Sequence, residues 1–225
     1  MKKFYVLLLS FFVITNVIGQ GRATGHISGN IQKAEIVSAS TFKSINEVFY
    51  QNDFQGADPF AQMVMENIDG NTDNPVITAI PLDFTAGYIL LVLNTDTTNV
   101  WAGSNSYFAT PAQADRWLIT PAIAITDSAV LSWNAFSVII QGTGTGESYE
   151  VYVTTTIAGA APAHTDFTNA PVFTITTEGA SPAWASHEVD LKALGFVNQT
   201  IYIAFRHTSN DEGVLGITIF LLKGI

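Results

Sequence analysis

The chain has 225 residues, a formal net charge of −10 and no cysteine. The negative charge argues against sequence-independent binding to nucleic acid, and the lack of cysteine excludes disulfides, thiolate metal sites, a cysteine nucleophile and a lipid-modified N-terminal cysteine. Hydrophobic residues make up 48% of the chain and charged residues 12%, a balance that argues against disorder for most of its length and is typical of exported β-proteins.

The N-terminus has the pattern of a secretory signal peptide over residues 1–20. Lys2 and Lys3 precede a largely apolar run that extends to Ile14, and small residues follow around Gly19. No later segment has the roughly 20 consecutive apolar residues that a bilayer crossing requires. We therefore expect a secreted or cell-surface protein without a membrane span, with the periplasm as the alternative location.

The rest of the chain divides into a short leader and one domain. Residues 21–46 are small and polar with little periodicity, which predicts a leader or linker. Residues 47–225 form the predicted domain, in which short β-type runs alternate with turn residues. These runs fall at residues 47–50, 87–93, 99–103, 106–110, 116–120, 129–138, 148–156, 171–177, 186–191, 200–208 and 213–222. No stretch of ten or more residues has a convincing helical stripe, so the sequence predicts an all-β fold.

The alternation within these runs predicts how the strands are layered. Leu131, Trp133 and Ala135 point to one side of their strand, whereas Ser132 and Asn134 point to the other. One buried face per strand is the pattern of two antiparallel sheets packed against each other. About ten strands in one domain favour a jelly-roll β-sandwich over a seven-stranded immunoglobulin domain.

Four segments in order carry a family resemblance: "SNSYFATPAQADRWLITPAIAI", "LSWNAF", "ESYEVYVTTT" and "HEVDLKALGFVNQTIYIAFRHTSNDEGVLGI". Together they resemble the cleaved-adhesin and choice-of-anchor J family of secreted Bacteroidetes proteins, over about residues 47–223. The resemblance implies a jelly-roll β-sandwich that acts as a non-catalytic binding or adhesion module. Its partner would be a glycan or a host or matrix protein.

Catalytic motifs are missing from the sequence. The glycine-rich residues 141–148 lack the lysine of a phosphate loop, and His187-Glu188 lacks the second histidine of a zinc protease because Leu191 stands in its place. The alternative function is a jelly-roll polysaccharide hydrolase or lyase, for which Tyr152, Tyr202 and Arg206 are the candidate residues. For Arg206 we expect instead a carboxylate partner at the edge of the sandwich.

The four tryptophans divide into two pairs. Trp117 and Trp133 lie within alternating strands, so we expect both to be core anchors. Trp101 and Trp184 lie near turn residues, where one ring face could stay open. These two are the predicted ligand-binding residues, with a sugar ring stacked on an indole.

The segment "DGNTD" predicts a structural calcium site. Asp69, Asn71 and Asp73 stand at alternate positions of a turn, and oxygen ligands at this spacing can converge on one hard cation. The loop is not an EF-hand, because its sixth and twelfth positions lack glycine and glutamate. The alternative is an ordinary turn, in which Asp and Asn side chains bond to the local backbone.

The family resemblance implies a second calcium position at Asp53. Related sandwiches pair an acidic residue of the first strand with two aspartates of the last strand. Here Thr218 and Ile219 stand where the aspartates would fall, so the principal carboxylates are missing.

Overall fold

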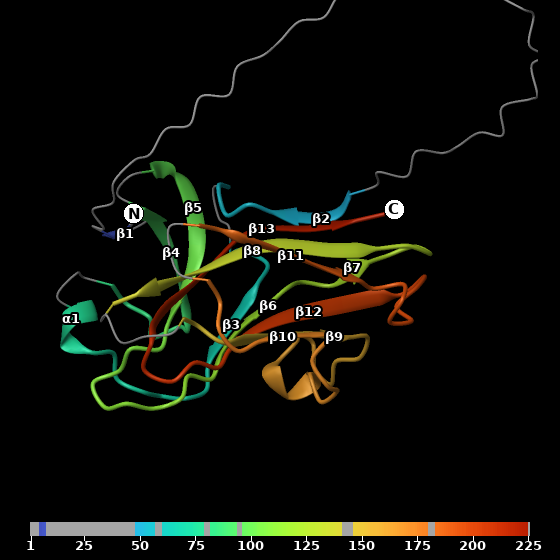
Figure 1. The fold of residues 1–225 in the computed structure, drawn as a ribbon. Helices are drawn as coiled ribbons and strands as arrows, with labels where there is room; N and C mark the ends of the chain where they lie inside the picture. Colours follow the sequence, from blue (N-terminus) through green and yellow to red (C-terminus); the bar gives the residue numbers. More distant parts are fainter. Residues whose placement is uncertain are drawn as a thin grey trace, which may run out of the picture.

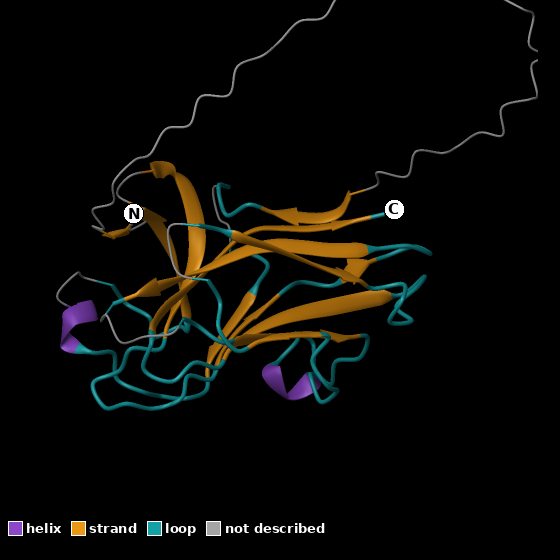
Figure 2. Cartoon of the chain, viewed as in Figure 1, coloured by secondary structure: helices purple, strands orange, loops and turns teal. Residues whose placement is uncertain are grey.

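Two β-sheets packed face to face make up the described part of the protein (Figures 1 and 2). The computed structural model describes residues 5–7, 48–56, 60–78, 82–93, 96–140, 146–179 and 183–224. Within these residues the only helical segments are the short α1 (Pro75–Thr78) and the 3-10 turn η1 (His164–Asp166). The prediction of an all-β jelly-roll sandwich is confirmed.

The first sheet has seven strands, in the order β1-β4-β5-β13-β8-β11, with β2 on the same edge of β13 as β5. All pairs are antiparallel except β1 with β4. The strands are β1 (Tyr5–Leu7), β2 (Val48–Asn52), β4 (Tyr88–Leu93), β5 (Asp96–Asn105), β8 (Val130–Ile139), β11 (Ala185–Asp190) and β13 (Gly213–Lys223).

The second sheet has six strands, in the order β10-β9-β12-β6-β3, and β7 pairs with the start of β12. All its pairs are antiparallel. The strands are β3 (Val64–Asn67), β6 (Arg116–Ile119), β7 (Ile123–Ala124), β9 (Tyr149–Thr154), β10 (Phe173–Ile175) and β12 (Thr200–His207).

The core between the sheets follows the predicted alternation. In β8, Leu131, Trp133 and Ala135 are buried, whereas Ser132 and Asn134 are partly exposed. The Trp133 indole N–H donates to the Tyr149 hydroxyl across the core at 3.0 Å. Trp133 is therefore a core anchor, as predicted.

The outer face of the first sheet carries a second apolar cluster, covered by α1 and the segment that follows it. Ile77 of α1, together with Leu82 and Phe84, packs against Trp101 of β5 and Phe136 of β8. The sequence did not predict this covering segment, because α1 is only four residues long. Its effect is to bury a sheet face that would otherwise be open.

The expected strand at residues 106–110 is wrong. Phe108 makes only an isolated bridge with Asp73, and the Asn105 side chain accepts from the Tyr107 N–H at 3.0 Å. Pro111 follows directly and has no N–H for a ladder. This segment is therefore a loop that leads to β6. Three short strands, β1, β3 and β7, were not predicted.

The predicted signal peptide and leader lie almost wholly outside the described residues. Of residues 1–20 only Tyr5–Leu7 are described, and none of residues 21–46 is. Both segments stay predictions. Among the described residues, no helix is long and apolar enough to cross a membrane.

Candidate functional site

The loop between β3 and α1 lies at one end of the sandwich, against the loop that precedes β6. The backbone N–H of Ile68 donates to the Asp115 carbonyl at 2.9 Å, and the N–H of Ala109 donates to the Thr72 carbonyl at 2.9 Å. We call residues 68–73 the aspartate loop. Its neighbours in space come from a segment about 40 residues later in the chain, which joins β5 to β6.

Arg116, the first residue of β6, joins two carboxylates of the aspartate loop. Its Nε lies 3.0 Å from Oδ2 of Asp69, and its Nη2 lies 3.3 Å from Oδ1 of Asp73. The Arg116 side chain is only 1% exposed, and its guanidinium lies 4.9 Å from the centre of the Phe108 ring. Because a buried guanidinium needs carboxylate or other acceptor partners, these contacts fix the loop against the sheet.

The predicted convergence of Asp69, Asn71 and Asp73 is found for the two aspartates only. Their carboxylates meet at the guanidinium of Arg116, whereas the Asn71 side chain donates to the Gln113 carbonyl at 3.2 Å. Asp69 also accepts from the Asn71 N–H at 2.7 Å, which is the local turn bond of the alternative interpretation. Calcium binding here stays a prediction, and a calcium ion would share these carboxylates with Arg116.

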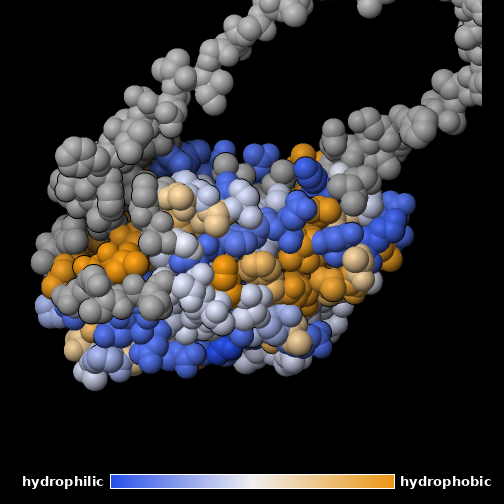
Figure 3. Space-filling view, in the orientation of Figure 1, coloured by the Kyte–Doolittle hydropathy of each residue, from blue (hydrophilic) through white to orange (hydrophobic). Residues whose placement is uncertain are grey.

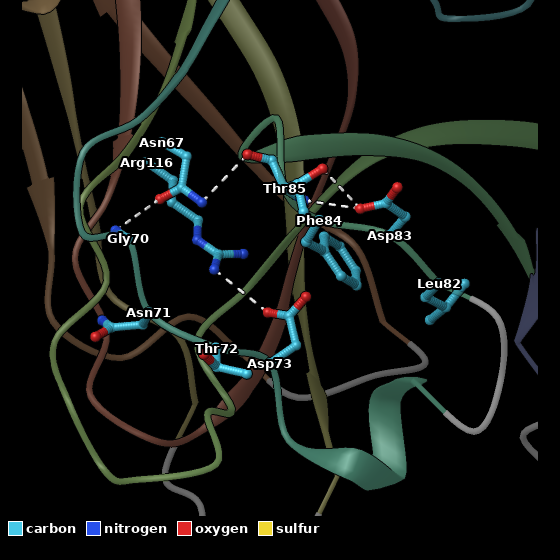
Figure 4. A pocket seen from close by; sticks show the side chains of 10 residues that line it. All are labelled: Asn67, Gly70, Asn71, Thr72, Asp73, Leu82, Asp83, Phe84, Thr85 and Arg116. Atoms are coloured by element: carbon cyan, nitrogen blue, oxygen red, sulfur yellow. Dashed lines mark hydrogen bonds and ion pairs between the residues drawn. The ribbon is translucent and has the colours of Figure 1, made fainter.

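A pocket of about 500 Å³ opens beside the aspartate loop (Figure 4). One wall is the loop itself, and the other is the segment 82–85 that follows α1. The two walls are joined where the Asn67 amide donates to the Thr85 carbonyl at 3.3 Å. Arg116 lies between them, as Figure 4 shows. We call this the arginine pocket.

A second hollow, of about 270 Å³, lies on the other side of the aspartate loop. It is lined by Ile68, Asp69 and Asn71 from the loop, by residues 112–115 and by Arg206 of β12. Asn71 lines both hollows. The aspartate loop therefore contributes to two recesses at one end of the sandwich, with two carboxylates and the exposed side chain of Ile68.

Residues 84–217, which include Arg116 and most of the two sheets, match the family model of the Cleaved Adhesin Domain. The chain belongs to the cleaved-adhesin family. This confirms the resemblance seen in the sequence, and it supports a role in binding or adhesion. No curated protein matches the chain.

Solved structures of cleaved-adhesin domains have the same fold. The K3 domain of Lys-gingipain from Porphyromonas gingivalis has a TM-score of 0.52 and 18% identity, over 78% of this chain and 98% of that domain. The K2 domain of Lys-gingipain has a TM-score of 0.50 and 18% identity, over 80% of this chain and 98% of that domain. At this identity the similarity concerns the fold alone.

Arg206 pairs with carboxylates, as the sequence predicted, but the expected position at the edge of the sandwich is wrong, because β12 is the central strand of the second sheet. Its Nε lies 2.8 Å from Oδ1 of Asp115, and its Nη1 lies 3.3 Å from Oε2 of Glu150. The guanidinium also covers the ring of Trp117, at 5.2 Å from its centre. Trp117 is buried among Tyr152 and other outer-face residues, so it too is a structural anchor.

The residues named for the hydrolase or lyase alternative do gather on one sheet face. Arg206 and Tyr202 share a face of β12, and the Tyr152 hydroxyl donates to Oε2 of Glu150 at 2.5 Å. Burial and this bond to Glu150 raise the pKa of Tyr152. A phenol that serves as a general base needs a lowered pKa, so the environment of Tyr152 does not favour the lyase chemistry.

The expectation of an open ring face at Trp101 is wrong. Trp101 is fully buried, with its ring centre 4.9 Å from that of Phe136 and 6.4 Å from that of Trp184. The reason is the covering segment around α1, which closes the outer face of the sheet over β5. Trp184 is partly exposed, and its role in binding a sugar stays a prediction.

Asp53 lies near the strand partner that the resemblance implied. Asn52 pairs with Phe220 in the β2–β13 ladder, so Asp53 lies close in register to Ile219 and Thr218. The Asp53 carboxylate accepts from the Gln55 N–H at 3.0 Å. In the described part of the chain, no three acidic or histidine side chains are grouped as metal ligands. The Asp53 calcium position stays a prediction.

The sequence did not predict a buried chain of polar side chains behind the aspartate loop. His207 Nε2 lies 2.7 Å from Oε2 of Glu147, and its Nδ1 lies 3.0 Å from the Ser104 hydroxyl. All three side chains are at most 1% exposed. The order serine, histidine, carboxylate resembles a hydrolase triad, but a serine buried this deeply is closed to a substrate.

Proposed function

We propose that this protein is an extracellular, non-catalytic adhesion module that binds a glycan or a host or matrix protein. The observation that carries the proposal is the cleaved-adhesin match over residues 84–217. The predicted signal peptide supports the extracellular location. The ligand is bound at the end of the sandwich that holds the aspartate loop, where residues of this loop line two recesses.

Binding by the predicted mature chain, residues 21–225, tests this proposal. We expect saturable retention on an array that carries both polysaccharides and purified matrix proteins. A glycan that contacts Trp184 should also shift the tryptophan fluorescence, because the other three tryptophans are buried. Absence of retention on both halves of the array would contradict the proposed function.

Non-specific adsorption needs its own control. Figure 3 shows hydrophobic areas between hydrophilic ones on one face of the protein. Among the described residues, Leu194 and Val197 are exposed large hydrophobic side chains, in the loop between β11 and β12. The double variant Leu194→Ser, Val197→Ser should bind like the unchanged protein if recognition occurs at the aspartate loop.

We also propose that a structural calcium ion binds at Asp69, Asn71 and Asp73, and that Asp53 is a second position. Binding to the folded state alone raises stability by about 2.7 kcal/mol at a calcium concentration 100-fold above the Kd. This corresponds to a rise of several degrees in Tm for a domain of this size. The measurement is Tm in EDTA and in millimolar calcium, and equal values in both would contradict calcium binding.

The site of the ion is tested with Asp73→Asn, and Asp127→Asn is the control because Asp127 is exposed. The readout is the calcium-dependent rise in Tm and not Tm itself, since Asp73 also pairs with Arg116. We expect the rise to disappear in Asp73→Asn and to persist in Asp127→Asn. A rise that persists in both would place the ion elsewhere.

A further inference from the structure

One donor of the buried Arg116 guanidinium has no partner in the part of the chain that the structure describes. Nε and Nη2 bond to Asp69 and Asp73, whereas Nη1 is buried without a hydrogen-bond acceptor. In Figure 4 one terminal nitrogen points at Asp73, and the other points away from it, between the two walls of the arginine pocket. Leaving a buried charged donor unpaired is costly, so Nη1 is the group beside this pocket that most needs an acceptor.

The walls of the arginine pocket are of two kinds. Leu82 and Phe84 are buried beneath one wall, at 3% and 0% exposed, and exposed polar side chains form the rim. Asp83 accepts from both the N–H and the hydroxyl of Thr85, at 3.1 and 2.7 Å, which fixes that part of the rim. A volume of about 500 Å³ lies within the usual size range of small-ligand pockets.

The charges around the pocket restrict what can bind. Arg116 contributes one positive charge, whereas Asp69, Asp73 and Asp83 contribute three negative ones. This excess of negative charge disfavours an anionic ligand. A cation cannot accept a hydrogen bond, so it would leave the Nη1 donor of Arg116 unpaired. A neutral group is therefore favoured, and it must offer an acceptor to Nη1 and a donor to a carboxylate.

We infer that the arginine pocket binds a saccharide unit of a neutral glycan. A sugar hydroxyl both accepts and donates, so one hydroxyl can accept from Arg116 Nη1 while it or its neighbour donates to Asp73. The exposed side chains of Thr72, Asp83 and Thr85 on the rim offer hydrogen-bond partners to the other hydroxyls of the sugar. This inference rests on the proposed adhesion function and narrows its ligand to neutral, hydroxyl-rich chains.

The test blocks the pocket mouth without touching Arg116. Thr72 is exposed and lines the pocket, and an arginine there would fill the space and compete for the aspartates. Thr126→Arg is the matched control, because Thr126 is exposed, follows β7 and lines none of the pockets described above. Both variants change the net charge equally, and Tm of each shows that it is folded.

The probes are immobilised neutral polysaccharides (galactan, xylan and mannan), anionic ones (heparin and polygalacturonate) and purified matrix proteins. We expect the unchanged protein and Thr126→Arg to bind a neutral polysaccharide with equal affinity. Thr72→Arg should bind at least about tenfold more weakly, the ratio that corresponds to losing one or two hydrogen bonds. Binding of the unchanged protein to the anionic chains should be weaker than to the neutral ones.

The contrary results separate this inference from the proposed function. Equal binding of a neutral glycan by Thr72→Arg and the unchanged protein would overturn the arginine pocket as the binding site and leave the function standing. Retention only on anionic chains or only on matrix protein would overturn the neutral-glycan ligand and leave adhesion standing. No retention on any probe would overturn both.

Discussion

Replacing Arg116 with methionine is expected to lower the free energy of unfolding by about 3–5 kcal/mol, the usual cost of removing one partner of a buried ion pair. Asp69 is 3% exposed and Asp73 11% exposed, so neither carboxylate can regain full hydration when the guanidinium is gone. Chemical denaturation of both proteins, with the midpoint and slope compared, measures the loss.

Arg206→Met is the matched control for this result. Arg206 is also paired with two carboxylates, but its side chain is 31% exposed, and exposed ion pairs contribute at most about 1 kcal/mol. A second variant that combines Arg116→Met with Asp69→Asn and Asp73→Asn should recover part of the loss, because it removes the unpaired charges. A loss in Arg116→Met no larger than in Arg206→Met would contradict the role assigned to the buried pair.

The layered fold was predictable because strand alternation is a local property. Along residues 130–135 of β8, partly exposed and buried side chains alternate, as the sequence pattern predicts for the two faces of a strand. The error at residues 106–110 has a local cause as well. Tyr107 and Phe108 have high β propensity, but the Tyr107 N–H donates to the Asn105 side chain, and the carbonyls of both residues accept from Asn74. Propensity alone does not show where such bonds go.

The site was only partly predictable, because it depends on which strands become neighbours. The spacing of Asp69 and Asp73 correctly indicated two carboxylates that converge. Their partner Arg116 is more than 40 residues away, and it reaches them only because β3 pairs with β6, where Asn67 lies opposite Arg116. Since β3 was not recognised as a strand, nothing in the sequence selected this arginine from the others.

The same reason applies to the buried histidine. His207 and Glu147 are 60 residues apart, and they meet because β12 pairs with β9, which begins just after Glu147. Arg206-His207 drew attention in the sequence as one unit. The two side chains lie on opposite faces of β12, with Arg206 on the face that carries Trp117 and His207 in the interior. Strand alternation predicts that the side chains of Arg206 and His207 lie on opposite faces of the sheet. It does not predict which residue each of them contacts.

The second large effect is expected for Trp101→Ala, which should lower the free energy of unfolding by about 3–5 kcal/mol. The Trp101 ring is fully buried against Phe136 and Trp184, so its removal leaves a cavity under the α1 segment. Trp184→Ala should cost less, because part of that ring is already in contact with solvent. Thermal and chemical denaturation of the two variants measure the difference.

Trp101→Phe separates packing from hydrogen bonding at this position. The Trp101 indole N–H has no acceptor among the described residues, so phenylalanine removes ring volume but no protein hydrogen bond. Its cost should therefore fall well below that of Trp101→Ala. At a temperature where all three variants are folded, Trp101→Phe should bind any ligand of the domain as the unchanged protein does. A stable Trp101→Phe variant that has lost glycan binding would contradict the structural role and restore Trp101 as a binding residue.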